Sequence, residues 1–174
     1  MLFTTPETIP EPTPHPLLQG RFNGRLAFIE LVRQGFAVAA AQGRREIIVC
    51  DPDFSDWPLG ERAVAETLND WARSGRKFTM LANHYAELPR RHARFVSWRK
   101  TWGHLVECRA SSASPANNLP SAFWSADWVF ERIDIVRCVG VAGSEVGRRI
   151  ALKERLNERL LNSSPAFSAT TLGL

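Results

Sequence analysis

The stretch Ile47-Ile48-Val49-Cys50-Asp51-Pro52-Asp53-Phe54 decides the fold that we expect of this chain. Its first four residues favour a strand and show no polar alternation, which indicates a central strand covered on both faces. The strand ends in an acidic turn, where Asp51 and Asp53 flank Pro52 and Asp56 follows. In open α/β sheets, ligands bind at the carboxyl ends of the strands. The stretch therefore predicts an α/β domain with candidate functional residues at one edge of its sheet.

The sequence on either side of this strand predicts an alternation of helices and strands. Residues 26–41 are heavily apolar and predict a buried helix, and residues 59–72 carry apolar side chains at helical spacing. Residues 77–82 predict the next strand, and a third helix is expected after Pro89. Later patterns predict strands at 105–108, 128–133 and 136–141 and a closing helix within 143–162. We therefore expect a single α/β domain with a mixed, mostly parallel sheet and helices on both faces.

Composition predicts how this domain sits within the chain. Residues 1–20 contain five of the eleven prolines and no periodic apolar pattern, so we expect residues 1–23 to be a disordered leader. The α/β domain is expected to span residues 24–162, and residues 163–174 are expected to form a C-terminal tail. The domain would then account for most of the 174 residues.

General features of the sequence indicate a soluble protein. Hydrophobic residues make up 44% of the chain and charged residues 23%, and no apolar run approaches the ~20 residues that span a bilayer. We see no secretory signal, so we expect a cytoplasmic location and no membrane partner. The cysteines Cys50, Cys108 and Cys138 are far apart in apolar runs, which favours buried thiols over disulfides or a metal site. No resident cofactor or metal is predicted.

A basic segment at residues 90–100 suggests contact with nucleic acid. The overall charge of +4 is unevenly spread, and this segment carries Arg90, Arg91, Arg94, Arg99 and Lys100 among aromatic side chains. Basic side chains neutralise phosphates and aromatic rings stack on bases, so a nucleic-acid-binding module is one hypothesis. The competing interpretation is a helix whose aromatic stripe faces the core and whose charges are solvated.

The acidic turn allows a catalytic hypothesis. An Asp51-x-Asp53 pair after a hydrophobic strand resembles the opening motif of haloacid-dehalogenase-type phosphohydrolases. That resemblance implies that Asp51 attacks phosphorus and that Asp53 acts as acid and base beside Mg²⁺. Asn83 stands where that family has Ser or Thr, and its downstream acidic pair is missing. Alternatively, the carboxylates cap their own turn and Asp56 caps the following helix.

His84 and Tyr85 follow the strand at residues 77–82 and could reach the same edge of the sheet. Imidazole titrates near neutral pH, which makes His84 a candidate general base, although a loop histidine is often only a hydrogen-bonding residue. The candidate catalytic residues are therefore Asp51, Asp53 and His84. The candidate ligand-binding residues are Asp51, Asp53, Asp56, His84 and Tyr85.

The element order and the pair Gly143-Ser144 resemble a half-domain of the phospholipase D-like superfamily over residues 24–162. The resemblance implies a His-x-Lys-x-x-x-x-Asp motif, with His as the nucleophile and Lys stabilising the phosphate. Placing the motif's Asp on Asp134 puts Asp127 at the His position and Val129 at the Lys position. Neither residue can perform that chemistry, so the resemblance implies a degenerate member. It also implies a homodimer, since such half-domains pair about their catalytic strands.

The sequence thus predicts a phospholipase D-like domain with a binding or structural role and without catalytic activity. The chain as a whole, with its closing Thr-Thr-Leu-Gly-Leu, also resembles a bacterial protein family to which no activity attaches. Two alternatives stay open: a Mg²⁺-dependent phosphohydrolase that uses Asp51 and Asp53, and a nucleic-acid-binding module that uses residues 90–100.

Overall fold

A computed structural model describes residues 16–112 and 118–169 of the chain. Residues 1–15 of the expected disordered leader lie outside the described residues. So do residues 170–174 of the expected C-terminal tail. Within the described part, no helix is both long and apolar enough to cross a membrane.

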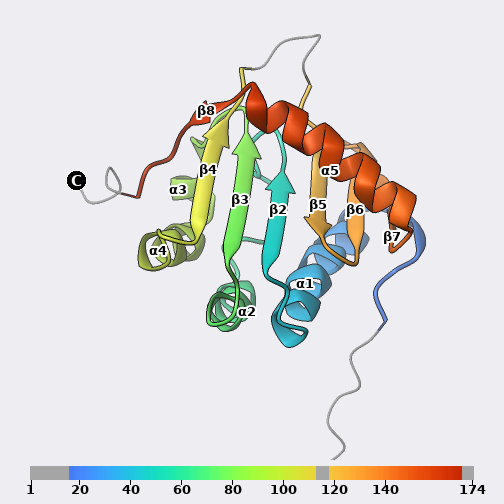
Figure 1. Cartoon of the computed structure of the whole chain (residues 1–174), viewed down its shortest axis with the longest axis horizontal. Coiled ribbons are helices and arrows are strands. Elements are labelled where there is room, and N and C mark those ends of the chain that lie inside the picture. Colours follow the sequence, from blue (N-terminus) through green and yellow to red (C-terminus); the bar gives the residue numbers. More distant parts are fainter. Residues whose placement is uncertain (1–15, 113–117, 170–174) are drawn as a thin grey trace, which may run out of the picture.

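One eight-stranded sheet runs through the described residues (Figure 1). In spatial order its strands are β1 (Gly20–Asn23), β7 (Val139–Gly143), β6 (Val129–Asp134), β5 (Ser121–Ser125), β2 (Glu46–Cys50), β3 (Lys77–Ala82), β4 (Val106–Ala110) and β8 (Ser164–Pro165). Residues 20–23, which we expected in the leader, form the edge strand β1. Residues 164–165, from the expected tail, form the opposite edge.

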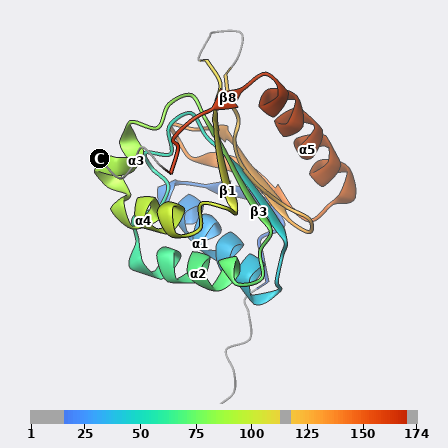
Figure 2. The ribbon, with the colours of Figure 1, turned by 60° about the vertical axis from the view of Figure 1, so that its left-hand side comes forward.

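Helices cover both faces of the sheet, as the sequence predicts (Figure 2). One face carries α1 (Arg25–Ala41), α2 (Arg62–Ala72), α3 (Glu87–Arg91) and α4 (Ala93–Thr101). The other face carries α5 (Val146–Leu161), which crosses the strands diagonally (Figure 1). The helix expected after Pro89 is two helices, because His92 has the non-helical angles φ −130° and ψ 50°.

The prediction of a mostly parallel sheet is wrong. Only β2 with β3 and β3 with β4 are parallel. The other five neighbouring pairs of the described sheet are antiparallel. Because the sheet is covered on both faces, residues 47–50 of β2 are apolar and buried whatever the direction of the neighbouring strands. The continuous hydrophobicity of this strand therefore predicted its burial correctly. It did not predict the direction of the neighbouring strands.

The core has two layers, one on each face of the sheet. The larger layer packs α1, α2 and α4 against the sheet through aromatic side chains, including Phe28, Phe78, Phe95, Phe123 and Phe130. The smaller layer lies under α5, where Leu152 and Leu156 contact Ile48, Trp124 and Val129. Three large rings (Phe28, Trp57 and Phe130) meet with centroids 5.7–5.8 Å apart. These rings pack directly beside Arg132, whose guanidinium lies over the Phe28 ring.

Strand register brings one end of β2 close to two segments that are distant in sequence. Cys50 pairs with Ala122 on β5, and Ser121 pairs with Arg132 on β6. Residue 51, directly after β2, therefore lies next to the start of β5 and the end of β6. The carboxyl ends of β3 and β4 lie at this same edge, since both run parallel to β2.

Candidate functional site

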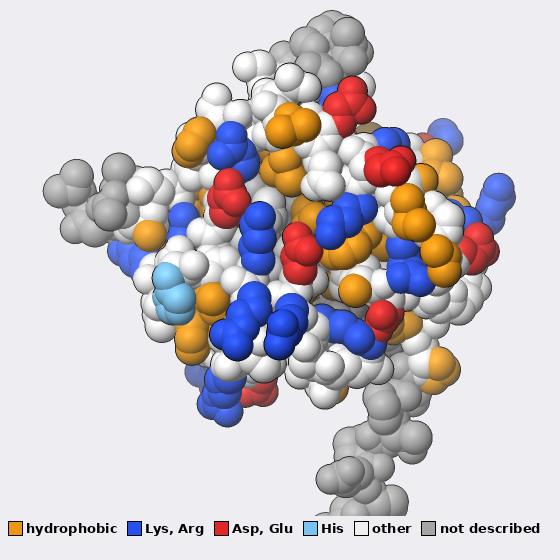
Figure 3. Space-filling model, in the orientation of Figure 1, with side chains coloured by type: hydrophobic (Ala, Val, Ile, Leu, Met, Phe, Trp, Pro, Cys, Tyr) orange, Lys and Arg blue, Asp and Glu red, His pale blue; other side chains and the backbone are white. Residues whose placement is uncertain are grey.

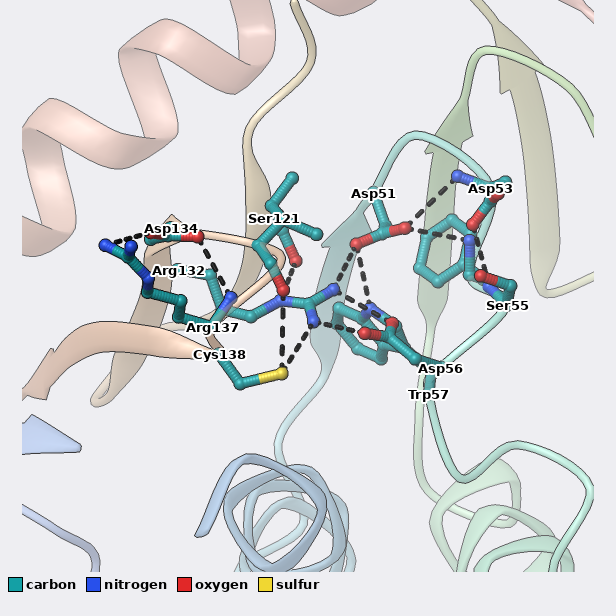
Figure 4. Close-up of polar contacts among 12 residues, drawn as sticks. Asp51, Asp53, Ser55, Asp56, Trp57, Ser121, Arg132, Asp134, Arg137 and Cys138 are labelled. Carbon is teal, nitrogen blue, oxygen red and sulfur yellow. Dashed lines mark hydrogen bonds and ion pairs between the residues drawn. The ribbon is translucent and has the colours of Figure 1, made fainter. Parts of the chain in front are cut away.

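A buried arginine organises the polar side chains at the end of β2 (Figure 4). The Arg132 guanidinium donates to Asp51 Oδ2 at 2.7 Å and to both oxygens of Asp56 at 2.5 and 3.0 Å. Its Nε donates to Ser121 Oγ at 2.8 Å, and its Nη1 lies 3.5 Å from Cys138 Sγ. We call these five residues the Arg132 cluster.

Asp51 uses all of its hydrogen-bonding capacity inside the protein. Its Oδ1 accepts from the backbone N–H groups of Asp53 and Phe54 at 3.1 and 2.8 Å. Its Oδ2 accepts from Trp57 Nε1 at 3.1 Å as well as from Arg132. A carboxylate has about four lone-pair positions, so four donors satisfy it. With 2% of its surface exposed, Asp51 is a buried and fully paired anion.

The charges of the cluster stabilise one another. The Arg132 side chain is fully buried, whereas the Asp56 side chain keeps 24% of its surface exposed. Burial alone would lower the pKa of the Arg132 guanidinium, but the hydrogen bonds and charges of Asp56 and Asp51 outweigh it and raise that pKa. The guanidinium also lies 3.9 Å from the centroid of the Phe28 ring. The cluster thus joins the acidic turn, β5 and β6 around one permanent cation.

Asp53 caps the acidic turn. Its Oδ1 accepts from the backbone N–H of Ser55 at 2.9 Å, the pattern of an aspartate turn. Phe54 completes the turn in the left-handed region at φ 58°, which is strained for a bulky side chain. The ring of Phe54 is fully buried, and its carbonyl oxygen lies 2.8 Å from His92 Nε2. Packing and hydrogen bonds therefore hold this strained turn in place.

His84 and Tyr85 do not join the Arg132 cluster. The His84 side chain is exposed, whereas Tyr85 is buried. The Tyr85 hydroxyl lies 2.6 Å from the carbonyl oxygen of Arg109 and 3.0 Å from that of Met80, between β3 and β4. Burial raises the pKa of this hydroxyl above its ordinary value, so it stays protonated at neutral pH. Of the five residues expected to share a site, the structure joins Asp51 and Asp56 through Arg132 and places Asp53 in the turn between them.

The positions aligned with the His and the Lys of the phospholipase D motif lie at the opposite end of the sheet from the Arg132 cluster, whereas Asp134, at the motif's Asp position, ends β6 two residues after Arg132. Asp127, at the His position, forms an ion pair with Arg44. Val129, at the Lys position, is 1% exposed and packs in the core layer under α5. A cavity of about 420 Å³ lies here, and both Asp127 and Ser144 line it. Gln19 also lines it, with its amide nitrogen 2.8 Å from Ser144 Oγ and its amide oxygen accepting from the Ser144 backbone N–H.

The basic segment has one buried member. Arg99 is 6% exposed, whereas Arg90, Arg91, Arg94 and Lys100 are exposed. Arg91 pairs with Glu87 at 2.8 Å and Arg94 donates to the Gly60 carbonyl at 2.9 Å. The aromatic stripe of this segment faces inward, with Phe95 and Trp98 buried in the main core.

The prediction of buried thiols is confirmed for Cys50, Cys108 and Cys138, which are all free and buried. Burial raises the pKa of the Cys50 thiol well above its usual range and that of Cys108 to about 11. Residues 16–112 and 118–169 contain no group of three or more His, Cys, Asp or Glu side chains arranged to hold a metal ion.

Sequence reasoning missed Arg132, the centre of the cluster. Two signals could have found it. Arg132 is a basic residue at the same strand parity as the apolar Phe130, which predicts that its side chain faces the core, and buried charges require partners. The acidic turn carries three carboxylates after a strand, so an excess of negative charge there calls for a cation from elsewhere in the sheet.

No protein-family model matches this sequence, and no curated protein sequence matches it. Solved structures do match. NucT from Helicobacter pylori superposes with a TM-score of 0.56 and 11% identity over 84% of this chain and 97% of NucT. TrmBL2, an archaeal chromatin protein described as showing a novel mode of DNA binding, superposes with a TM-score of 0.63 and 16% identity.

The match to TrmBL2 covers 87% of this chain and 55% of TrmBL2, so the chain spans about half of that protein. At these identities the likeness concerns the fold alone. The architecture of this chain resembles the fold of NucT.

Proposed function

We propose that this chain is a phospholipase D-like domain that binds or scaffolds and does not hydrolyse phosphodiesters. The observation that carries the proposal is the state of the two motif positions. Asp127 is neutralised by Arg44, and Val129 is an apolar residue buried under α5. Phosphoryl transfer by this fold needs a nucleophile and a cation to stabilise the developing charge, and these positions supply neither.

The Arg132 cluster supports the same proposal. A carboxylate nucleophile needs a lone pair directed at phosphorus, and a Mg²⁺ ligand needs an oxygen open to the ion. Both oxygens of Asp51 are occupied by internal donors. Asp53 points its Oδ1 at the turn that it caps. The arrangement favours a structural role for the carboxylates over the phosphohydrolase alternative.

Hydrolysis assays test this proposal. We expect purified chain to give no rate above buffer with bis-aryl phosphates or aryl phosphates, with or without Mg²⁺. A matched pair of variants, Asp51→Asn and Asp53→Asn, should also leave the background rate unchanged. A Mg²⁺-dependent rate in the unaltered chain that disappears in Asp51→Asn and falls strongly in Asp53→Asn would overturn the proposal in favour of the phosphohydrolase.

The proposal includes a homodimer, because phospholipase D-like half-domains pair about their catalytic strands. Light scattering at micromolar concentration should give twice the mass of the 19.5 kDa chain. A monomeric mass across the concentration series would remove this part of the proposal without affecting the hydrolysis result.

A second candidate function is nucleic-acid binding, which the fold similarity to the DNA-binding TrmBL2 favours. The chain carries a net charge of +4, and Arg90 and Lys100 are exposed on α3 and α4. The α5 face fits this role less well, because its Lys and Arg side chains are interspersed with Asp and Glu (Figure 3). Ion pairs on that face include Arg155 with Glu131 and Lys153 with Glu46. Any contact with nucleic acid is therefore proposed for the helical face that carries α3 and α4.

Fluorescence polarisation with a labelled DNA duplex tests this candidate. Affinity should fall as salt rises, with a slope that reports the number of phosphates contacted. The double variant Arg90→Gln/Lys100→Gln should weaken binding and reduce the slope, whereas Arg148→Gln, on α5, should not. Binding that is missing at low salt, or equally affected by all these variants, would dismiss the helical face as the contact surface.

A further inference from the structure

The turn that joins β6 and β7 exposes aliphatic side chains to solvent. Ile133 is 74% exposed and Val136 is 94% exposed. Single exposed apolar residues are common on proteins, whereas a contiguous apolar patch marks an interaction site. Ile133, Ile135 and Val136 all line one cavity, so they form a patch and are not scattered single residues. We call residues 133–137 the hairpin tip.

The fold behind the hairpin tip holds it in one conformation. Asp134 Oδ1 accepts from the backbone N–H of Arg137 at 3.0 Å (Figure 4). The backbone N–H of Cys138 donates to the Ile135 carbonyl oxygen at 3.3 Å. Cys138 itself is buried, and its carbonyl oxygen accepts from the N–H of Gly24 at 3.1 Å. A tip that is already ordered loses little conformational entropy when it binds a partner.

A cavity of about 1070 Å³ lies beside the hairpin tip, against α5 and the ends of β5 and β6. Apolar side chains line it from the tip and from Leu119 and Pro120, and charged and polar side chains line it from α5 and β6. Val136 and Glu158, which line it, are exposed, so the cavity opens to solvent. Its volume lies above the ~300–1,000 Å³ of small-molecule sites and leaves room for a protruding segment of protein. We call it the α5 groove.

The hairpin tip and the α5 groove carry opposite charges that the fold leaves largely unused. The Arg137 side chain is 81% exposed, and its ion pair with Asp134 spans 3.8 Å, near the outer limit of such a contact. Glu158, on α5, is exposed and forms no ion pair with another described residue. The tip thus offers a cation and the groove an anion, each beside apolar surface.

A second copy of the chain fits this surface better than a small molecule does. A molecule bound within the groove would leave the protruding Val136 side chain in water, whereas another protein surface can cover it. The tip and the groove adjoin on the same molecule, so a two-fold axis places each tip in the groove of the other copy and buries both at once. Opposite charges on the tip and the groove then meet twice, once on each side of the axis.

We propose that two copies of the chain dimerise through the hairpin tip. Each tip enters the α5 groove of the other copy, with Arg137 of one protomer paired to Glu158 of its partner. The inference rests on the homodimer in the proposed function and gives that homodimer a surface. This surface lies at the end of β6 away from Asp127 and Val129, so the aligned His and Lys positions stay outside the interface.

Sedimentation equilibrium of the full chain over a concentration series tests the proposal. The unaltered chain should form a dimer of the 19.5 kDa subunit. Val136→Asp should raise the dimer dissociation constant at least about tenfold, because it places a charge in the apolar centre of the interface. The matched control Leu26→Asp makes a similar change at an aliphatic side chain on α1 that is 83% exposed, and it should dimerise as the unaltered chain does.

Charge reversal tests the pairing of Arg137 with Glu158 without altering the apolar contact. Arg137→Glu and Glu158→Arg should each raise the dissociation constant, because each places like charges opposite one another across the interface. The double variant Arg137→Glu/Glu158→Arg should return the dissociation constant towards that of the unaltered chain, because the pair is restored with its signs exchanged.

The outcomes separate this interface from the homodimer itself. A monomer at every concentration would overturn both. A dimer that Val136→Asp leaves unchanged, or that Leu26→Asp weakens equally, would overturn the hairpin interface alone and leave the homodimer of the proposed function standing. Single reversals without effect, or a double variant no tighter than the single ones, would overturn the pairing. If circular dichroism shows that Val136→Asp does not fold, the charge-reversal set at the exposed Arg137 and Glu158 decides.

Discussion

Replacing Arg132 with methionine should strongly destabilise this domain. The substitution keeps an unbranched side chain of similar length over the Phe28 ring but removes the cation that Asp51 and Asp56 share. Asp51 would then be a carboxylate that is 2% exposed, with neutral donors only. Removing one partner from a buried ion pair costs about 3–5 kcal/mol. The loss of the ion pair with Asp56 adds less to this cost, because the Asp56 side chain is 24% exposed and can be solvated.

That loss is large relative to the whole stability of a domain. Single domains unfold with a free energy of about 5–15 kcal/mol, so Arg132→Met should remove about a fifth or more of it. In urea, with a slope of about 2 kcal/mol per molar, a loss of about 4 kcal/mol moves the midpoint down by about 2 M. Circular dichroism during urea unfolding measures this shift directly.

Arg155→Met is the matched control for that experiment. Arg155 also binds a carboxylate with two hydrogen bonds, at 2.7 Å each to Glu131, but its side chain is 52% exposed. An exposed pair of this kind contributes about 0–1 kcal/mol to stability, so the urea midpoint of Arg155→Met should hardly differ from that of the unaltered chain. Equal shifts for Arg132→Met and Arg155→Met would refute the idea that burial makes the Arg132 cluster structurally important.

Three further predictions follow from other parts of the fold. Burial lowers the pKa of His92 below its ordinary 6.5, so the unfolded chain binds this proton more readily. Stability should therefore hold above pH 6.5 and fall as the pH drops below it, by up to about 1.4 kcal/mol per pH unit. Urea unfolding at several pH values should show this component vanish in His92→Gln, and a pH dependence that survives the substitution would assign it to other groups. Gly140→Ala should destabilise by about 1–3 kcal/mol or more, since a Cβ there would lie 2.1 Å from the Glu131 carbonyl oxygen. Gly147→Ala, on α5 with open space around it, should instead stabilise by roughly 0.5–1 kcal/mol, and thermal unfolding that ranks the two alike would contradict this packing. Tyr85→Phe removes a buried hydroxyl between two strand carbonyls and should cost about 0.5–1.5 kcal/mol by the same measurement, whereas an unchanged melting temperature would show that those contacts contribute nothing.

Local sequence patterns predicted the elements that are long or strongly apolar. The helix at residues 26–41 and the strands at 47–50 and 77–82 appear within one or two residues as α1, β2 and β3. Periodicity reports which side of an element is buried, and burial dominates these segments. The closing helix α5 was found for the same reason, since Leu152 and Leu156 lie one turn apart on its inner face.

Strand pairing could not be read from the same patterns. Ser121–Ser125 is short, begins and ends with serine and follows a loop rich in polar residues, so nothing local marked it as β5. It is nevertheless completely buried, because it lies between β2 and β6 at the centre of the sheet. Its antiparallel pairing with β2 joins residues that are far apart in the sequence. The sheet that we expected to be mostly parallel is therefore mostly antiparallel.

The candidate site was predicted in part for a related reason. The acidic turn after β2 was located correctly, and the capping alternative for Asp53 anticipated its bond to Ser55. The partner that gives Asp51 and Asp56 their role lies 81 and 76 residues away on β6. Only the register of β5 and β6 brings Arg132 to them, and that register is not encoded in any local motif.

The most direct test of the account compares stability and activity in one variant. Asp51→Asn should lower the free energy of unfolding by about 3–5 kcal/mol, because it leaves the buried Arg132 with only the Asp56 carboxylate. The same preparation should hydrolyse bis-aryl phosphates with Mg²⁺ no faster or slower than the unaltered chain, with both at the buffer rate. An Asp51→Asn protein of unchanged stability that has lost a measurable Mg²⁺-dependent activity would show that Asp51 serves chemistry and not the fold.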